Sequence, residues 1–386
     1  MTSNLLNDKW INLDSHELRL LLDARIGHPG QYDGHNPDKL YLPLADTSCK
    51  IVLNFRDKKI VSIEPGPAFD SAEWKQIYEE VETSILVGRI KVGREYSFSS
   101  YRVVGSWRGD RSGVQILAPP DHAPRAPVER AEHPFILEFP MTESNYLPIT
   151  SYRRLREHRD LTLLLNILLR ARINIQPRRF DHFWAITNSD LSALEVKWVQ
   201  QSYFATLGES VIDELSPPSK EKIEEIELEK YYAKLGYQGN SLNVPADLDQ
   251  SICLYRSLSP SDREKFDRAT FWMDMATRQW NISMSASYAA LVSAIESLIT
   301  TQGRGVTKRF KLFLENYAPG ATLSDRRDEM YNLRSGILHG SELMQIDQNL
   351  AFGWDPPWWD QRELHDELWT LTKIALRNWL KNPTII

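Results

Sequence analysis

Hydrophobic and polar positions alternate in short runs through much of the first 150 residues, and this alternation is the period of β-strands. Residues 50–55 and 59–63 alternate in this way on either side of the polar segment Arg56-Asp57-Lys58, which predicts a β-hairpin. Residues 73–86 interrupt the alternation, because their apolar side chains recur at helical spacing. We therefore expect a hairpin followed by an amphipathic helix.

The rest of this region returns to a strand-like pattern at residues 88–104. Residues 118–134 contain five prolines and are expected to form an exposed loop, because proline donates no hydrogen bond to a helix or a sheet. A further strand is predicted at residues 135–139. Together these patterns predict a mixed, β-rich N-terminal domain of residues 1–150.

Helical periodicity begins at about residue 157, and residues 161–173 are apolar on nearly every side, as in a buried helix. Ser216-Pro217 then offers a serine cap and a proline for the first turn of a charged helix over residues 220–235. We predict that residues 151–250 form a mainly helical connecting region.

The pattern is helical almost throughout beyond residue 250. Ser259 and Pro260 have the form of a helix start, and Gly340 directly follows His339 as the glycine that ends a helix. The predicted helices span residues 260–280, 285–300, 306–317, 324–339 and 362–381. Short connections favour antiparallel neighbours, so residues 251–386 are predicted to form an antiparallel α-helical bundle. The fold class expected for the whole chain is α+β with several domains.

The composition is that of a globular protein. The chain has 386 residues, of which 42% are hydrophobic and 25% charged, and this suffices for two or three domains with their own cores. Its net charge of -6 gives no attraction of the whole molecule to nucleic acid, so any contact with RNA needs a local basic patch. Cys49 and Cys253 are too few for a disulfide framework or a zinc site built from cysteines.

The sequence contains no pattern typical of a membrane protein or of a metal site. No segment reaches the roughly 20 apolar residues that span a bilayer, and the N-terminus lacks the pattern of a signal peptide. The histidines have no convincing spacing for metal ligands, and neither a P-loop nor a kinase motif is complete. We therefore expect a cytoplasmic protein with no membrane contact, no metal and no cofactor.

Arg334 and His339 are the most informative pair of residues in the chain. An arginine supplies a permanent cation and a histidine moves a proton near neutral pH, which together suffice to cleave a phosphodiester without a metal. On an ideal helix their side chains point ~140° apart, so a second copy of the chain would be needed to complete one site. The alternative is structural: Arg334 forms a salt bridge with Asp328 or Glu329, and His339 only ends the helix.

Three C-terminal segments, residues 290–299, 308–314 and 331–340, resemble the HEPN superfamily in its Apea-like branch. The signature of this family is an arginine followed after four to six residues by a histidine, and Arg334 and His339 match it. The resemblance implies a helical bundle that dimerises. In active members it also implies a metal-independent endoribonuclease of defence or toxin systems.

The resemblance covers residues 260–381 and implies supporting roles for two further residues. Glu296 would lie near Arg334 and orient it, although a carboxylate at the edge of the bundle is an equally good interpretation. Ser335 stands where active members often carry Asn, Asp or His, and its hydroxyl can still donate a hydrogen bond to phosphate.

A small basic cluster lies at the start of the helix predicted over residues 306–317. It could hold an RNA backbone, whereas the alternative interpretation is a solvated helix face. The cluster consists of Arg304, Lys308, Arg309 and Lys311.

The function predicted from the sequence is that of a HEPN-type endoribonuclease, a toxin or effector in antiphage defence by abortive infection. Its partners would be RNA, with tRNA as one candidate, and a second copy bound through the C-terminal bundle. Residues 1–250 would sense a trigger such as a phage component. The alternative is a catalytically silent HEPN scaffold that binds RNA or nucleotide ligands or mediates oligomerisation.

Overall fold

The computed structural model describes most of the chain, and the described residues fall into two compact units. These residues are 4–11, 13–27, 30–86, 88–120, 133–175, 185–187, 194–196, 209–232, 241–280, 282–299, 305–319, 326–348 and 356–383. Unit 1 comprises Met1–Gly93, Pro140–Glu157 and Val211–Glu214, and unit 2 comprises Arg94–Phe139, His158–Ser210 and Leu215–Ile386. The chain is a mixed α/β protein with antiparallel sheets and a C-terminal helical region. The domain boundaries near residues 150 and 250 remain predictions.

Unit 1 contains an antiparallel sheet with the strand order β1-β2-β3-β4. Its elements are α1 (Ser15–Ile26), β1 (Gln31–Tyr32), β2 (Lys39–Leu42), β3 (Ile51–Arg56), β4 (Lys59–Pro65) and α2 (Ser71–Val81). Asp57 and Lys58 connect β3 to β4 with φ of 51° and 64°. Two positive φ angles in a two-residue loop match the twist of the flanking strands, and the predicted hairpin is confirmed.

The amphipathic helix predicted over residues 73–86 is also confirmed. The side chain of Asp70 caps α2 by accepting hydrogen bonds from the backbone N–H groups of Ala72 and Glu73. The helix then continues with wider, π-helical turns over Glu82–Leu86. The cap explains why the helix begins two residues before the predicted start.

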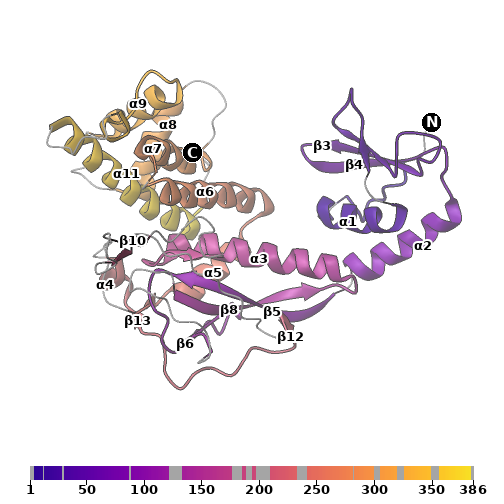
Figure 1. The fold of residues 1–386 in the computed structure, drawn as a ribbon, viewed down its shortest axis with the longest axis horizontal. Coiled ribbons are helices and arrows are strands. Elements are labelled where there is room, and N and C mark those ends of the chain that lie inside the picture. The colour runs from indigo at the N-terminus through magenta and orange to yellow at the C-terminus, as the bar shows by residue number, and fades with distance from the viewer. Residues whose placement is uncertain are drawn as a thin grey trace. The chain divides into compact units, whose positions relative to one another are not determined.

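The second sheet has the strand order β12-β5-β8-β7-β6, with β9 paired to β5. Its strands are β5 (Arg89–Ser99), β6 (Ser106–Arg108), β7 (Gln115–Leu117), β8 (His133–Glu143), β9 (Ile173–Asn174) and β12 (Val211–Ile212). The strands predicted within residues 88–104 and 135–139 correspond to β5 and β8. Of the predicted loop at residues 118–134, residues 121–132 lie outside the described residues. The helix α3 (Leu147–Leu168) runs along β5 and β8 (Figure 1).

The bounds predicted for the buried helix at residues 161–173 were wrong, because α3 begins at Leu147 and ends at Leu168. Beyond the helix, Ile173 joins β9 and pairs with Ser99 of β5. The side chain of Asn166 accepts a hydrogen bond from the Ile173 N–H at 2.7 Å and donates to its carbonyl at 2.9 Å. The Asn166 side chain thus bonds both backbone groups of Ile173, so residue 173 does not continue the helix that the apolar pattern alone predicts.

The charged helix predicted over residues 220–235 was wrong as well. Within the described part of this segment, helix is confined to α4 (Leu228–Tyr232), and β13 (Glu225–Ile226) pairs in parallel with β14 (Val244–Pro245). The Ser106 N–H donates to the Glu221 carbonyl, and the Ile223 N–H donates to the Ser106 carbonyl. The backbone of this segment therefore bonds to Ser106 and to β14 instead of forming the hydrogen bonds of a helix. A further pair, β10 (Ala185–Thr187) and β11 (Leu194–Val196), is antiparallel.

The C-terminal helices follow the predicted order closely. They are α5 (Leu248–Ser257), α6 (Pro260–Gln279), α7 (Met284–Glu296), α8 (Val306–Tyr317), α9 (Arg327–Leu338), α10 (Gln345–Gln348) and α11 (Pro356–Lys381). The Ser259 hydroxyl caps α6 by accepting from the Asp262 N–H, as the sequence indicates. In contrast to the prediction, α11 begins at Pro356 rather than at residue 362, because a first turn needs no N–H donors and tolerates proline.

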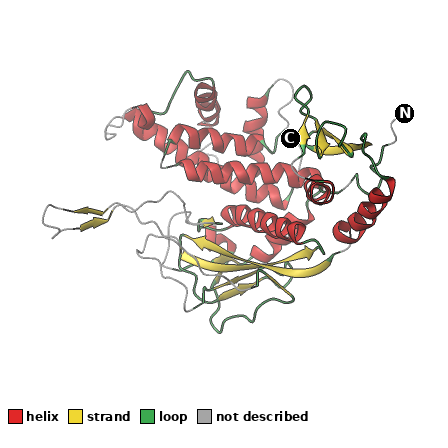
Figure 2. Cartoon of the chain, turned by 45° about the vertical axis from the view of Figure 1, so that its right-hand side comes forward, coloured by secondary structure: helices red, strands yellow, loops and turns green. Residues whose placement is uncertain are grey.

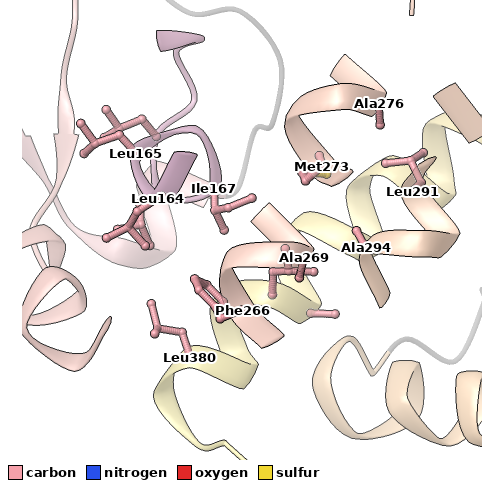
Figure 3. Close-up of a cluster of buried hydrophobic side chains, with 14 of the residues drawn as sticks. Leu164, Leu165, Ile167, Phe266, Ala269, Met273, Ala276, Leu291, Ala294 and Leu380 are labelled. Atoms are coloured by element: carbon pink, nitrogen blue, oxygen red, sulfur yellow. The ribbon is translucent and has the colours of Figure 1, made fainter. Parts of the chain in front are cut away.

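These helices and α3 enclose one continuous apolar core in unit 2. Helix α6 packs along α7, and α11 packs on α5, α6, α7 and α8. Figure 2 shows the helices gathered together, and Figure 3 shows side chains of α3, α6, α7 and α11 pointing toward one another. Ala269 and Ala294 are small and fully buried, which lets the helix backbones approach closely. This core fixes the positions of α7, α8 and α9, which carry the candidate site.

Candidate functional site

The last turn of α9 places His339 at a defined helix end. Gly340 has φ of 71°, and its N–H donates to the Ile337 carbonyl at 3.1 Å. The Ser341 N–H donates to the Gly336 carbonyl at 3.0 Å, which completes a Schellman motif. The predicted glycine stop is therefore confirmed. His339 is the C-cap residue and is held by a bond from its own N–H to the Ser335 carbonyl.

Arg334 lies one turn earlier on α9 and pairs with Glu296, the last residue of α7. Its Nη2 is 2.5 Å from Oε2 of Glu296, and the side chains are 19% and 14% exposed. The hydroxyl of Tyr331 donates to the other carboxylate oxygen, Oε1, at 3.3 Å. One carboxylate therefore holds two side chains of α9. The predicted proximity of Glu296 to Arg334 is present in the structure.

The guanidinium of Arg334 is anchored at one nitrogen only. Among the described residues its Nε is buried without a hydrogen-bond partner. Nη1 makes no hydrogen bond to any described residue either. An arginine carries five N–H donors, so this one keeps donors for a further anion while Glu296 fixes its direction.

Tyr331 is a member of the site to which sequence reasoning gave no separate role. Burial raises the pKa of its phenol, and the negative charge of Glu296 raises that pKa further, whereas Arg334 and the Thr307 hydroxyl act in the opposite direction. Its ring lies 5.7 Å from the guanidinium carbon of Arg334 and 5.4 Å from the ring of Phe310. The sequence feature that could have indicated a role for Tyr331 is its position three residues before Arg334, because side chains at this spacing lie on one helix face.

The two predicted catalytic residues differ in their surroundings. Arg334 is largely buried, whereas His339 is exposed, and its imidazole makes no hydrogen bond to any residue that the structure describes. Ser335 is half-buried between them. Within the described chain no hydrogen bond joins the side chains of Arg334 and His339. Among the described residues, a single copy thus presents an ordered cation and an exposed imidazole that share no hydrogen bond.

The salt bridges considered as an alternative for Arg334 are not formed. Asp328 instead accepts Nζ of Lys311 at 2.7 and 2.8 Å, and Glu329 lies 3.6 Å from Arg326. Lys311, predicted to contact RNA, therefore has an anionic partner. Because the lysine and Asp328 side chains are 34% and 62% exposed, this pair is weak and a phosphate could replace the carboxylate.

The other basic residues lie at the start of α8. Lys308 is exposed and Arg309 is half-buried, and Arg304 lies outside the described residues. Gly305, the N-cap residue of α8, has φ of 89° and no side chain to cap the helix. The basic cluster therefore begins beside Thr307, which contacts the phenol of Tyr331. Its role in RNA binding remains a prediction.

Comparisons of the chain with family models, with curated proteins and with solved structures give no match. The chemistry of the site therefore rests on its own residues. Groups of three or more His, Cys, Asp or Glu side chains that could hold a metal ion do not occur among the described residues. In the same part of the chain, no helix has the length and apolar character needed to cross a membrane.

Proposed function

We propose that α6–α11 form a HEPN-type bundle and that the protein is a metal-independent endoribonuclease. The observation that carries the proposal is the guanidinium of Arg334, which Glu296 holds at Nη2 and whose Nε has no hydrogen-bond partner among the described residues. A fixed cation with a free donor suits the charge that develops on a phosphate during cleavage. The exposed imidazole of His339 follows one turn later on the same helix.

The proposed reaction is transesterification within RNA. His339 removes the proton of the ribose 2′-hydroxyl, whose oxygen attacks the adjacent phosphorus, and the bond from phosphorus to the 5′-oxygen breaks. The leaving 5′-oxygen takes up a proton, so the products are a 2′,3′-cyclic phosphate and a 5′-hydroxyl. Arg334 stabilises the negative charge of the pentavalent transition state through Nη1.

The site would be shared by two copies of the chain. In one copy Arg334 and His339 project in directions ~140° apart on an ideal helix, and their side chains are not bonded to each other. A two-fold axis beside α9 would bring the arginine of one copy toward the histidine of the other. Homodimerisation through the C-terminal helices is part of this proposal.

The cellular role rests on the resemblance to the HEPN superfamily. By that analogy the nuclease would be a cytoplasmic toxin or effector of antiphage defence, with tRNA among its substrates. The N-terminal region would respond to a phage-derived trigger.

A second candidate function is favoured by the same ion pair. If the carboxylate of Glu296 neutralises Arg334 completely, the bundle is a silent HEPN scaffold that binds RNA or nucleotide ligands or mediates oligomerisation. The exposed imidazole of His339, and the guanidinium nitrogens of Arg334 that make no hydrogen bond to described residues, favour the nuclease over the scaffold. An activity assay separates the two.

The test is incubation of the purified protein with total RNA and with tRNA in EDTA. We expect cleavage by the wild type and at least a ~100-fold loss in Arg334→Ala and in His339→Ala. Arg268→Ala and His35→Ala are matched controls, because both residues are exposed and lie outside the site. Equal activity in all five proteins would refute the nuclease at this pair and favour the scaffold.

A further inference from the structure

A chain of hydrogen bonds links two helices at the candidate site. It runs from Tyr331 of α9 to Glu296 at the end of α7 and returns to Arg334 of α9. Each bond joins side chains from different helices. The direction of the guanidinium thus depends on a carboxylate that a second side chain of α9 also holds.

The donors and acceptors in this chain have a fixed order. The carboxylate of Glu296 only accepts, so the phenol of Tyr331 must donate to Oε1 and Arg334 to Oε2. The phenol oxygen then keeps its lone pairs as acceptors, and the nearby Thr307 hydroxyl lowers the pKa of the phenol, as a donor to it should. Such bonds strengthen one another in partly buried surroundings.

We infer that Tyr331 is a positioning residue that sets the direction of Arg334 by fixing the carboxylate of Glu296. The inference rests on the proposed function for its catalytic consequence, but the coupling of the three side chains exists with or without a reaction. A carboxylate bonded at Oε1 is restrained from rotating about its terminal bond. Its other oxygen therefore holds Nη2 of Arg334 in one place.

The hydroxyl of Tyr331, rather than its ring, carries this role. The ring packs against Phe310, with the centroids 5.4 Å apart, and phenylalanine would preserve that contact. Removal of the hydroxyl alone would leave Oε1 of Glu296 without its donor from α9. Tyr331→Phe and Tyr331→Leu therefore separate positioning from packing.

The first part of the test is the steady-state kinetics of RNA cleavage. We expect Tyr331→Phe to lower kcat about 10-fold with KM within about 2-fold of wild type, because the charge that Arg334 stabilises develops in the transition state. Tyr288→Phe is the matched control, since that buried hydroxyl also bonds α9, at the Met330 carbonyl, but does not touch Glu296. A Tyr331→Phe enzyme as active as wild type, beside an impaired Tyr331→Leu, would reduce Tyr331 to a packing residue.

The second part asks whether Tyr331 acts through Glu296. We expect Tyr331→Phe to have no further effect on kcat in a Glu296→Gln background. If the two residues acted independently, the fold-reductions in kcat of the two substitutions would multiply. The free energy of unfolding of the same four proteins (the wild type, the two single variants and the double variant) is measured with urea, because this measurement does not depend on catalysis. If the wild type cleaves no RNA but the unfolding effects are non-additive, the proposed function fails and the positioning role stands. Additive effects in both assays would overturn the inference.

Discussion

Lys373 is a lysine buried in the core of unit 2. Its side chain is only 4% exposed, and Nζ donates to the Leu169 carbonyl at 2.6 Å, just beyond the end of α3. Burial, with the nearby charge of Arg377 as a second cause, lowers the pKa of Lys373 to about 7. Positive charge is favourable beside the carboxyl end of a helix, which explains why a lysine is tolerated here.

Lys373 makes the stability of the protein depend on pH in the alkaline range. Between pH 7 and 10.5 the unfolded chain binds a proton that the folded chain does not, so the free energy of unfolding rises with pH. The free energy of unfolding rises by about 1.4 kcal/mol per pH unit within that range. Lys373→Met removes the titrating group, so we expect the free energy of unfolding, measured with urea at pH 7, 8 and 9, to rise less with pH than in the wild type. Lys230→Met, at an exposed position, should leave the profile unchanged.

Arg334 should not be replaceable by lysine. An ammonium group tied to Glu296 has no second nitrogen to direct at a phosphate, whereas the planar guanidinium has. We expect Arg334→Lys to lower kcat/KM by roughly 100-fold, close to the effect of Arg334→Ala. Arg268→Lys is the control. Wild-type activity in Arg334→Lys would mean that charge alone suffices and that the fixed geometry has no catalytic role.

At the level of elements, the end of α9 determines where His339 lies. Gly340 adopts the left-handed conformation that the Schellman motif requires, and a β-carbon there is strained. We expect Gly340→Ala to lower the free energy of unfolding by about 1 kcal/mol and to reduce RNA cleavage by displacing the imidazole. Gly34→Ala is the control, because that glycine has neither a positive φ nor a neighbour within 4 Å of an added β-carbon. An unchanged urea midpoint in Gly340→Ala would contradict this account.

The elements that the sequence predicts well are those with a local signal at their ends. Ser259 and Gly340 mark the start of α6 and the end of α9, and Asp57-Lys58 turns the hairpin in unit 1. The segment at residues 220–235 was mispredicted because its backbone bonds are made to Ser106 and to β14, which are distant in sequence. Local patterns contain no information about such partners.

The candidate site was predictable to a similar degree. A spacing in one helix and a resemblance selected Arg334, His339 and Glu296. The contact of Glu296 with the phenol of Tyr331 depends on how α7 packs on α9, which no periodicity reveals. The salt bridge with Asp328, which was the alternative interpretation of Arg334, is not formed for the same reason, since Lys311 of the neighbouring helix pairs with Asp328.

At the level of the whole molecule, a shared site can be tested by mixing two inactive proteins. An Arg334→Ala chain retains His339, and a His339→Ala chain retains Arg334. If a site combines residues of two copies, half of the randomly formed dimers carry one intact site, and we expect about a quarter of wild-type activity after mixing. No recovery, at a dimer content matched by analytical ultracentrifugation, would mean that each site uses residues of one chain.

The position of α11 also has a consequence for how the protein is made. This helix packs on α5, α6, α7 and α8, and its Asp360 and Glu367 hold Arg326 next to the start of α9. The ribosome releases α11 after all of these helices, so their shared core cannot close before α11 has been made. A nascent chain that still lacks α11 also lacks the support that orders α7 and α9, and a toxic activity proposed for this bundle would be withheld until that helix has emerged.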